Sequence, residues 1–352
     1  LPISRGVRRN VVTSETDTPQ ERAKKWTLLQ SGQVDVVILS FDALARTKMN
    51  EAAVLAYVSQ VEAVERSIAL RKRALDQLQT AIEAEKEDLR EELIAETGCP
   101  AMTTRSAQLD WPLADALRYP AGLIDDFEWE RTLDGGGLFG ERNVRTVVKE
   151  PVGVVAAITP SNFPIEVVLN KLGPALAAGN TLVLKPDPHT PWTATRLGRL
   201  IAEHTDIPPG VVNVVATPSN EVAGMLGTDP RVDLISFTGS TEVGKLLMRR
   251  GADSMKRMFL ELGVKSVAIV LDDANPAVIV PSAVGVCVHA GQACAATTRM
   301  LVHRSLYDQA VADITAAYSL VPVGDPVRDD VLVGPVISAA QKGRVLGAID
   351  EA

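Results

Sequence analysis

Cys294 has the surroundings of a reactive thiol. It lies in AGQACAA (residues 290–296), where small side chains would let a substrate approach the sulfur closely. A thiolate is a strong nucleophile, so this position is a candidate for covalent catalysis. The alternative is a buried, inert thiol, which is the commoner fate of a cysteine. Cys287, placed among valines, is expected to belong to the core, and Cys99 follows a predicted helix end with no partner that the sequence identifies.

Two polar side chains near predicted strand ends have the groups that such a nucleophile needs. Glu261 lies in FLELGVKS (residues 259–266), flanked by apolar residues. It is either a salt-bridged core residue, for example with Lys265, or a general base whose pKa is adjusted by partial burial. Asn162, in TPSNFP (residues 159–164), follows a buried strand. It either braces the turn between two prolines or donates an N–H to a developing oxyanion.

Two further strand ends have groups suited to a ribose or a phosphate. Lys185 follows a strand at the carboxyl end of the predicted sheet, where open parallel sheets bind ligands; the alternative is a solvated Lys. The turn FTGS (residues 237–240) opens a helix whose backbone N–H groups can accept a phosphate, although Ser240 could be an ordinary N-cap. Residues 239–245 also spell GxxxxGK, but Leu246 stands where a P-loop needs Ser or Thr, so a P-loop is rejected.

Alternating strands and helices from residue 150 onward would position these groups. Their β-α-β order predicts a parallel sheet with helices on its faces. Before it, we expect a strand at residues 34–40, a helix or helix pair at residues 61–97 ended by TGCP, and a helix at residues 113–127 kinked or split at Pro120. The predicted strands are 152–159, 181–184, 211–215, 234–237, 258–262 and 267–271, and the helices are 165–178, 193–204, 220–226 and 241–250.

The composition excludes several classes of function. The 352 residues have a net charge of −8, which argues against nucleic acid or an anionic membrane as a whole-surface partner. Three cysteines fit a reducing, cytoplasmic compartment and no disulfide scaffold. The chain contains no apolar run long enough for a membrane span and no secretory signal. The four histidines have no ligand spacing, so no metal site is expected, and the GxGxxG at residues 135–140 follows no clear strand and is interpreted as a turn.

Taken in order, six motifs resemble the aldehyde dehydrogenase superfamily over residues 66–352. The resemblance implies an α/β fold with a Rossmann-like parallel sheet domain that binds NAD or NADP, and an α/β catalytic domain that is incomplete here. We expect an atypical N-terminal segment at residues 1–65, the NAD(P)-binding domain at 66–262 and the catalytic domain at 263–352. The motifs are EPVGVVAAITPSNFP, LGPALAAGNTLVLKP, FTGSTEVGK, LELGVKS, GQACAATTR and VGDPVRDDVLVGPVIS.

The resemblance also implies a role for each matching residue. Cys294 would add to a small-molecule aldehyde to form a thiohemiacetal, which hydride loss converts into a thioester. Asn162 and the Cys294 backbone N–H would hold the oxyanion, and Glu261 would activate the hydrolytic water. Lys185 would contact the adenosine ribose, and Ser240 the pyrophosphate. The full set of implied cofactor-binding residues is Thr159, Pro160, Lys185, Phe237, Gly239, Ser240, Leu262 and Gly263.

Departures from the family pattern leave an alternative open. Val264 replaces a Gly of the LELGGKS motif, Pro188 stands where many NAD-preferring members have an acid, and Ser161 replaces an aromatic residue. The family normally continues past Ala352 with a further cofactor contact and an oligomerisation strand, which makes the family's homo-oligomer doubtful here. The alternative to aldehyde oxidation is therefore a truncated or fused, catalytically inactive dinucleotide-binding remnant. Residues 1–60 are faintly similar to an SNF2-type helicase segment, with no phosphate-binding loop beside it.

Overall fold

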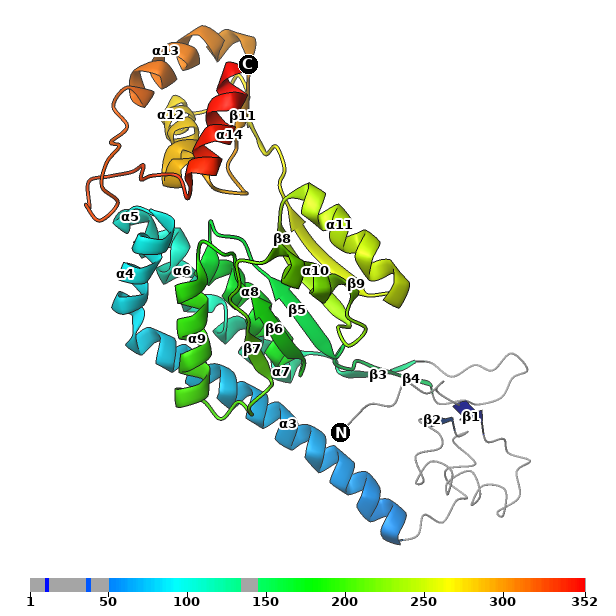
Figure 1. The fold of residues 1–352 in the computed structure, drawn as a ribbon. Helices are drawn as coiled ribbons and strands as arrows, with labels where there is room; N and C mark the ends of the chain where they lie inside the picture. The colour runs from blue at the N-terminus through cyan, green and yellow to red at the C-terminus, as the bar shows by residue number, and fades with distance from the viewer. Residues whose placement is uncertain (1–9, 13–35, 39–50, 134–144, 352) are drawn as a thin grey trace. The chain divides into compact units, whose positions relative to one another are not determined.

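The computed structural model describes residues 10–12, 36–38, 51–133 and 145–351 (Figure 1). The chain divides into two compact units, residues 1–68 with 126–150 and residues 69–125 with 151–352. The domain boundaries expected from the sequence, at 65/66 and 262/263, stay predictions. In the first unit, β1 (Asn10–Val12) pairs in parallel with β2 (Val36–Ile38), and β3 (Glu130–Leu133) pairs antiparallel with β4 (Arg145–Val148). β2 is the described part of the strand expected at residues 34–40; the glycine turn at 135–140 lies outside the described residues.

The predicted helix pair is present and ends where the sequence indicated. α3 (Glu51–Ala84) is followed by α4 (Lys86–Thr97), and Gly98 closes α4 in the left-handed conformation, with its N–H donating to the Ile94 carbonyl. A short helix α5 (Ala101–Thr103) and a π-helical turn η1 (Thr104–Gln108) come next. The helix predicted at 113–127 is split into α6 (Asp110–Asp115) and α7 (Arg118–Asp126), with Pro120 in the first turn of α7, where it costs no hydrogen bond.

A five-stranded parallel sheet forms the centre of the second unit. Its order is β7-β6-β5-β8-β9, so the first strand lies in the middle and the chain moves outward in both directions. The predicted strands and helices of this region are all present, and the predicted α/β class is confirmed. The strands are β5 (Val154–Ile158), β6 (Thr181–Lys185), β7 (Val212–Val214), β8 (Leu234–Gly239) and β9 (Arg257–Leu262), and the helices are α8 (Pro164–Ala177), α9 (Pro191–His204), α10 (Asn220–Thr228) and α11 (Thr241–Gly251).

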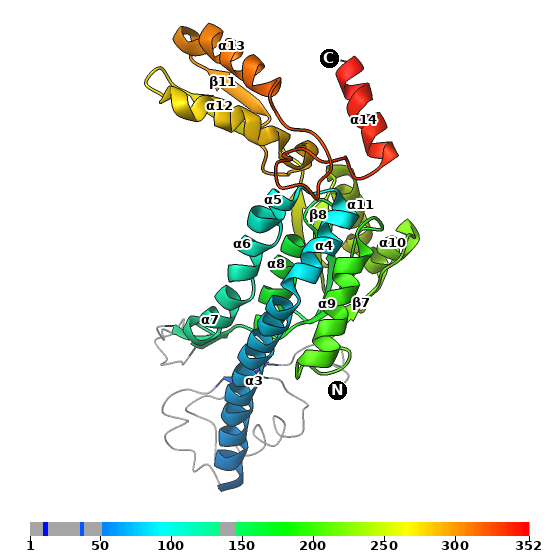
Figure 2. The same ribbon diagram turned by 90° about the vertical axis from the view of Figure 1, so that its left-hand side faces the viewer.

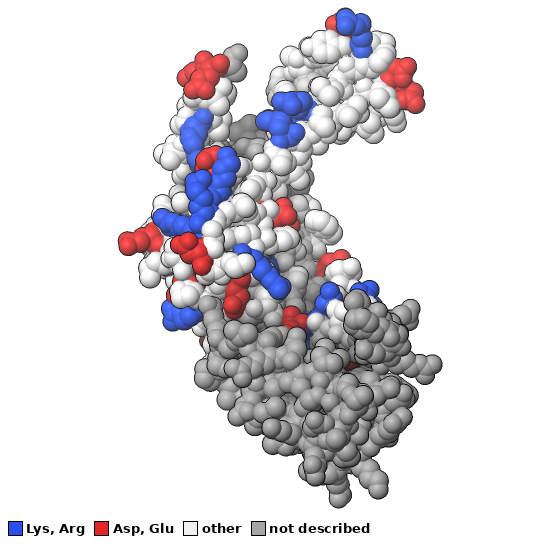
Figure 3. Space-filling view, turned by 90° about the vertical axis from the view of Figure 1, so that its right-hand side faces the viewer, with Lys and Arg blue, Asp and Glu red and all other residues white. Residues whose placement is uncertain are grey.

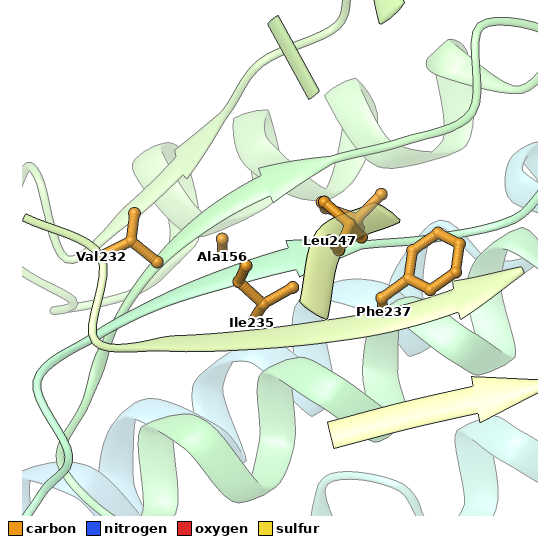
Figure 4. Close-up of a cluster of buried hydrophobic side chains, with 6 residues drawn as sticks. Ala156, Val232, Ile235, Phe237 and Leu247 are labelled. Atoms are coloured by element: carbon orange, nitrogen blue, oxygen red, sulfur yellow. The ribbon is translucent and has the colours of Figure 1, made fainter. Parts of the chain in front are cut away.

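Alternation along the strands explains why helices cover both faces. Ala156 and Ile158 of β5 pack with Ile235 and Phe237 of β8 and with Leu247 of α11 (Figure 4). The intervening side chains of β5 and β6 point to the opposite face, where α8 and α9 pack on strands β5, β6 and β7. The register places Ile158 beside Lys185 and Phe237, so the residues that follow β5, β6 and β8 meet at one edge of the sheet.

A smaller α/β layer follows the central sheet. β10 (Val267–Val270) and β11 (Arg299–Val302) form a parallel pair. α12 (Pro276–Val284) and α13 (Tyr307–Tyr318) pack together beside β11 (Figure 1, Figure 2), and Val270, Ile279 and Ala310 form the buried cluster between these elements. The other elements here are 3-10 turns η2 (Ala252–Ser254), η3 (Gly285–Gly291) and η4 (Arg304–Leu306) and the helix α14 (Ala339–Asp350).

One face of the β10–β11 pair is open. Val267, Ile269 and Leu301 alternate with the buried positions and are exposed, with Ile269 at 64%. Parallel strands are ordinarily covered on both faces, so this face differs from the inner strands β5, β6 and β8 of the central sheet.

The described surface and helices add two observations. None of the helices in the described part of the chain has the length and apolarity to cross a bilayer. On the face in Figure 3, Lys, Arg, Asp and Glu side chains are interspersed over the described atoms.

Candidate active site

The three predicted catalytic residues line one cavity of about 510 Å³. Asn162 comes from the loop after β5, Glu261 from β9, and Cys294 from the turn after η3. Of the predicted cofactor-binding residues, four also line this cavity, namely Pro160, Gly239, Leu262 and Gly263. The cavity lining does not include Thr159, Lys185, Phe237 or Ser240. A larger hollow of about 820 Å³ lies along α3, but its lining contains no thiol.

Hydrogen bonds connect Asn162 to the loop that contains Cys294. The Asn162 side-chain amide donates to the Gln292 carbonyl at 2.7 Å. The amide has two hydrogens, so the second is available to a ligand. The backbone carbonyl of Asn162 accepts hydrogen bonds from Gln108 Nε2 at 2.7 Å and from His289 Nε2 at 3.0 Å. Asn162 is therefore held from two sides, which fixes the direction of its amide.

His289 is the buried centre of this network. Its side chain is 1% exposed, and burial lowers its pKa to about 4, so the imidazole is neutral at neutral pH. The neutral ring donates from Nε2 to Asn162, while Nδ1 has no partner among the described residues. His289 and the following Ala290 both have positive φ, 53° and 54°, which costs on the order of 1–2 kcal/mol per residue. The surrounding contacts must hold this strained backbone in place.

A second contact anchors the same loop from the far side. The Gln292 side-chain oxygen accepts the Ile337 N–H at 2.9 Å. Ile337 ends an irregular segment, residues 321–337, that also packs on α5 and η1, just after α4. The Ala101 N–H of α5 donates to the Pro326 carbonyl at 2.8 Å, and Arg105 of η1 pairs with Asp329 at 2.6 Å. The nucleophile loop is thus connected to both α4–η1 and the central sheet.

The three cysteines differ sharply in their environment. Cys99 is fully buried, and this burial raises the pKa of its thiol to about 12, so it is inert. Cys287 is half-buried, less than the core position expected for it, because it lies in a 3-10 turn at the edge of the α12–α13 layer. Cys294 is exposed and lines the cavity. Of the three, Cys294 has the access that a nucleophile requires.

Two expectations for the segment around Glu261 are corrected. Glu261 is exposed, not partly buried, because β9 is the edge strand and alternate side chains such as Phe259 and Glu261 point away from α11. The ion pairs of the described residues include none between Glu261 and Lys265. Val264 is exposed and is not among the residues with positive φ, so its β-branched side chain does not strain the backbone here.

Lys171 of α8 lines the same cavity and was missed by the sequence analysis. Its side chain is 7% exposed, and its ammonium donates to Ser236 Oγ at 3.0 Å. Burial lowers its pKa to about 8, and the negative charge of Glu261 opposes that shift. The Phe259 ring centroid lies 5.7 Å from the ammonium. The available signal was a lysine within an otherwise apolar helical stretch, VVLNKLGPALA.

The residues at the edge of the sheet fit a ligand with a ribose and phosphates. Lys185 is 4% exposed, so the solvated alternative is wrong, and no described residue accepts a hydrogen bond from its ammonium. Burial lowers its pKa, against the opposing charge of Asp187. A Cβ on Gly239 would lie 2.5 Å from the Phe237 ring, so only glycine keeps this turn close to the sheet. Ser240 caps α11 by accepting the Val243 N–H at 3.4 Å, and the Phe237 side chain belongs to the core.

These features place an accessible thiol, an amide and a carboxylate in one cavity at the edge of a parallel sheet with helices on its faces. Residues 29–352 match the aldehyde dehydrogenase family, and the chain belongs to this family. It is 38% identical over 237 residues to betaine aldehyde dehydrogenase of Bacillus subtilis (66% of this chain, 47% of the relative). It is 39% identical over 241 residues to glutarate-semialdehyde dehydrogenase of Pseudomonas aeruginosa (66% and 50%).

Solved structures show the same fold. The aldehyde dehydrogenase of Mycobacterium tuberculosis, crystallised with NAD+, superimposes with a TM-score of 0.74 and 37% identity, over 80% of this chain and 56% of that one. The resemblance stated from the motifs is therefore confirmed. The chain spans about half the length of the curated relatives it matches.

Proposed function

We propose that the site carries out the NAD(P)-dependent oxidation of an aldehyde to a carboxylic acid. The observation that supports this most strongly is the 2.7 Å hydrogen bond from Asn162 to Gln292, two residues before the exposed Cys294. It holds an amide donor beside an accessible thiol in one cavity with a carboxylate. A nucleophile, an oxyanion donor and a base are the groups that acyl chemistry on a carbonyl requires.

The reaction would begin with the Cys294 thiolate adding to the aldehyde carbon. The carbonyl oxygen becomes an oxyanion, which accepts hydrogen bonds from the second Asn162 amide hydrogen and from the Cys294 backbone N–H. NAD or NADP, when bound, supplies the acceptor for the hydride that leaves the thiohemiacetal carbon and converts it into a thioester. Glu261, exposed to solvent, would take a proton from water, which attacks the thioester and releases the acid and the Cys294 thiol.

Lys185, Gly239 and Ser240 would hold the adenosine and pyrophosphate portions of the dinucleotide. Leu262 and Gly263, which line the cavity, would lie against the nicotinamide portion. The buried Lys185, which lies within the electrostatic influence of Asp187, supplies a positive charge, and the N-terminus of α11 supplies backbone N–H groups. Since the three cysteines are free, we place the protein in a reducing compartment, the cytoplasm.

The test is dinucleotide reduction by the purified chain, followed at high protein concentration with several aldehydes and with NAD and NADP in turn. Cys294→Ala should abolish it, because the sulfur forms the covalent bond, while the matched Cys287→Ala variant should keep it. Dinucleotide binding, measured by calorimetry, should survive both substitutions. Binding without any reduction by the unaltered chain would favour the inactive dinucleotide-binding remnant instead.

A further inference from the structure

A second hollow adjoins the catalytic cavity. It has a volume of about 290 Å³ and lies between α6–α7 and α8. Glu166 and Asn170, one turn apart on α8, line both this hollow and the cavity that contains Cys294. A substrate whose aldehyde group reaches Cys294 would therefore extend past these two side chains.

The charges around the two hollows favour a cation. Glu166 is half-buried, its carboxylate accepts a hydrogen bond from Asn170 at 2.9 Å, and burial raises its pKa. None of the ion pairs found among the described residues involves Glu166 or Asp115, the second acid of the outer hollow. The lining of the outer hollow contains no Lys or Arg, and the one Lys of the inner cavity, Lys171, is bonded to Ser236. A partly desolvated carboxylate without a cationic partner gains most from a positively charged ligand.

Aromatic side chains flank the same outer hollow. Trp111 and Tyr119 are 68% and 63% exposed, although large aromatic surfaces are ordinarily buried. The face of an indole or phenol ring attracts an ammonium group. Exposed rings beside unpaired carboxylates are a combination suited to an amine or a quaternary ammonium, and poorly suited to a carboxylate.

We propose that the substrate is an aldehyde with a positively charged amino or ammonium group, which Glu166 binds while Trp111 and Tyr119 flank it. This inference rests on the proposed function, because it takes Cys294 as the point where the aldehyde reacts. Sequence identity does not decide the question, since the chain is about equally similar to a betaine aldehyde and a glutarate-semialdehyde dehydrogenase. The carboxylates of the two hollows select the cationic class and disfavour aldehydes with a carboxylate tail.

The test uses thiol reagents of opposite charge that share the same reactive group and need no dinucleotide. Cys294 is modified with methanethiosulfonates that bear either an ethyl-trimethylammonium or an ethyl-sulfonate group. The rate constant of each modification is measured by peptide mass spectrometry, which distinguishes the Cys294 peptide from those of Cys287 and Cys99. The rate constant for the cationic reagent is divided by that for the anionic reagent, and this ratio is divided by the same ratio measured with 2-mercaptoethanol. We expect a normalised ratio well above one, and Glu166→Gln should lower it about fivefold, since one charge at close range in a partly buried site has an effect of this order.

Glu166→Gln keeps the shape of the side chain and an acceptor for Asn170, so the fold should persist. The matched control, Glu91→Gln, removes an exposed carboxylate on α4 that lines neither hollow and should leave the ratio unchanged. Asp115→Asn should lower the ratio by less than Glu166→Gln. A ratio that favours the anion, or one that Glu166→Gln leaves unchanged, would overturn the cationic site.

A kinetic comparison separates this proposal from the proposed function. The unaltered chain is assayed for dinucleotide reduction with 3-aminopropanal, propanal and succinate semialdehyde, and KM should be lowest for the amine. Charge-selective labelling without any dinucleotide reduction would reject the oxidation and keep the amine site. Oxidation with equal KM for all three aldehydes would reject the amine site and keep the oxidation.

Discussion

The central sheet and the β10–β11 pair are built from the same kind of parallel strand, yet they are covered differently. Helices enclose both faces of β5, β6 and β8, and the side chains at that edge are held tightly: Lys185 is buried, and Asn162 is fixed by three hydrogen bonds. The β10–β11 pair has one covered face, and Ile269 and Leu301 remain exposed on the other. The difference indicates that Lys185 and Asn162, the groups proposed to bind the cofactor and the oxyanion, are held in place within this chain, whereas the side chains of Cys294 and Glu261, the proposed nucleophile and base, are exposed.

Glu261, on the edge strand between the two regions, gives the largest expected effect. Glu261→Gln removes the base but keeps a similar shape, so acylation should proceed and thioester hydrolysis should slow about a thousandfold. Dinucleotide reduction should then show a burst of one equivalent per site, followed by slow turnover. The control is Glu91→Gln, an exposed acid on α4 outside the cavity. An unchanged steady-state rate without a burst would make Glu261 structural.

Covering the open face should raise activity. The segment of the Bacillus subtilis relative that follows its matched region is joined after Ala352, and we expect it to pack on the exposed Ile269 and Leu301. We expect turnover to rise about a hundredfold, because small displacements of reacting groups have large effects on rate. The same fusion with Cys294→Ala should show no gain. Equal turnover of the 352-residue chain and the fusion would show that the open face does not limit the site.

His289 tests the covered side through pH. Its pKa falls from 6.5 to about 4 on folding, so below pH 6.5 the unfolded chain binds a proton that the folded chain does not. The stabilisation that comes from keeping this imidazole neutral is complete above pH 6.5. As the pH falls to 4, the free energy of unfolding should decrease by about 3 kcal/mol. In urea unfolding, the free energy of unfolding of His289→Asn should lack this dependence on pH. The exposed control His204→Asn should keep it. If the free energy of unfolding changes with pH in the same way for His289→Asn and the unaltered chain, burial does not lower the pKa of His289 as proposed.

Gly98 gives the smallest effect and probes the attachment of residues 321–337. Its φ is +68°, and a Cβ there would lie 2.6 Å from the Pro335 side chain. Gly98→Ala should therefore lower the free energy of unfolding by about 1–2 kcal/mol. Gly122→Ala in α7 is the matched control, because nothing lies within 4 Å of its Cβ and Ala favours a helix, so it should raise stability slightly. Equal urea midpoints for the two variants would place residues 321–337 away from the end of α4.

Much of this architecture follows from the sequence because it depends on local patterns. The alternation of strands and helices between residues 152 and 271, the stop at Gly98 and the meeting of Asn162, Glu261 and Cys294 at one cavity were all predictable. The exposure of Glu261 was not, because it depends on which strand lies at the edge. Lys171 and Glu166 were missed because helical periodicity does not show which neighbouring element a polar side chain will face.

The most direct test of the account is to find the acyl group on Cys294 itself. The Glu261→Gln chain is mixed with one equivalent of aldehyde and excess NAD or NADP, quenched in acid and digested for peptide mass spectrometry. The account predicts an acyl thioester on the Cys294 peptide, formed in step with dinucleotide reduction and absent from the peptides of Cys99 and Cys287. Reduction of the dinucleotide with an unmodified Cys294, or acylation that needs no dinucleotide, would contradict it.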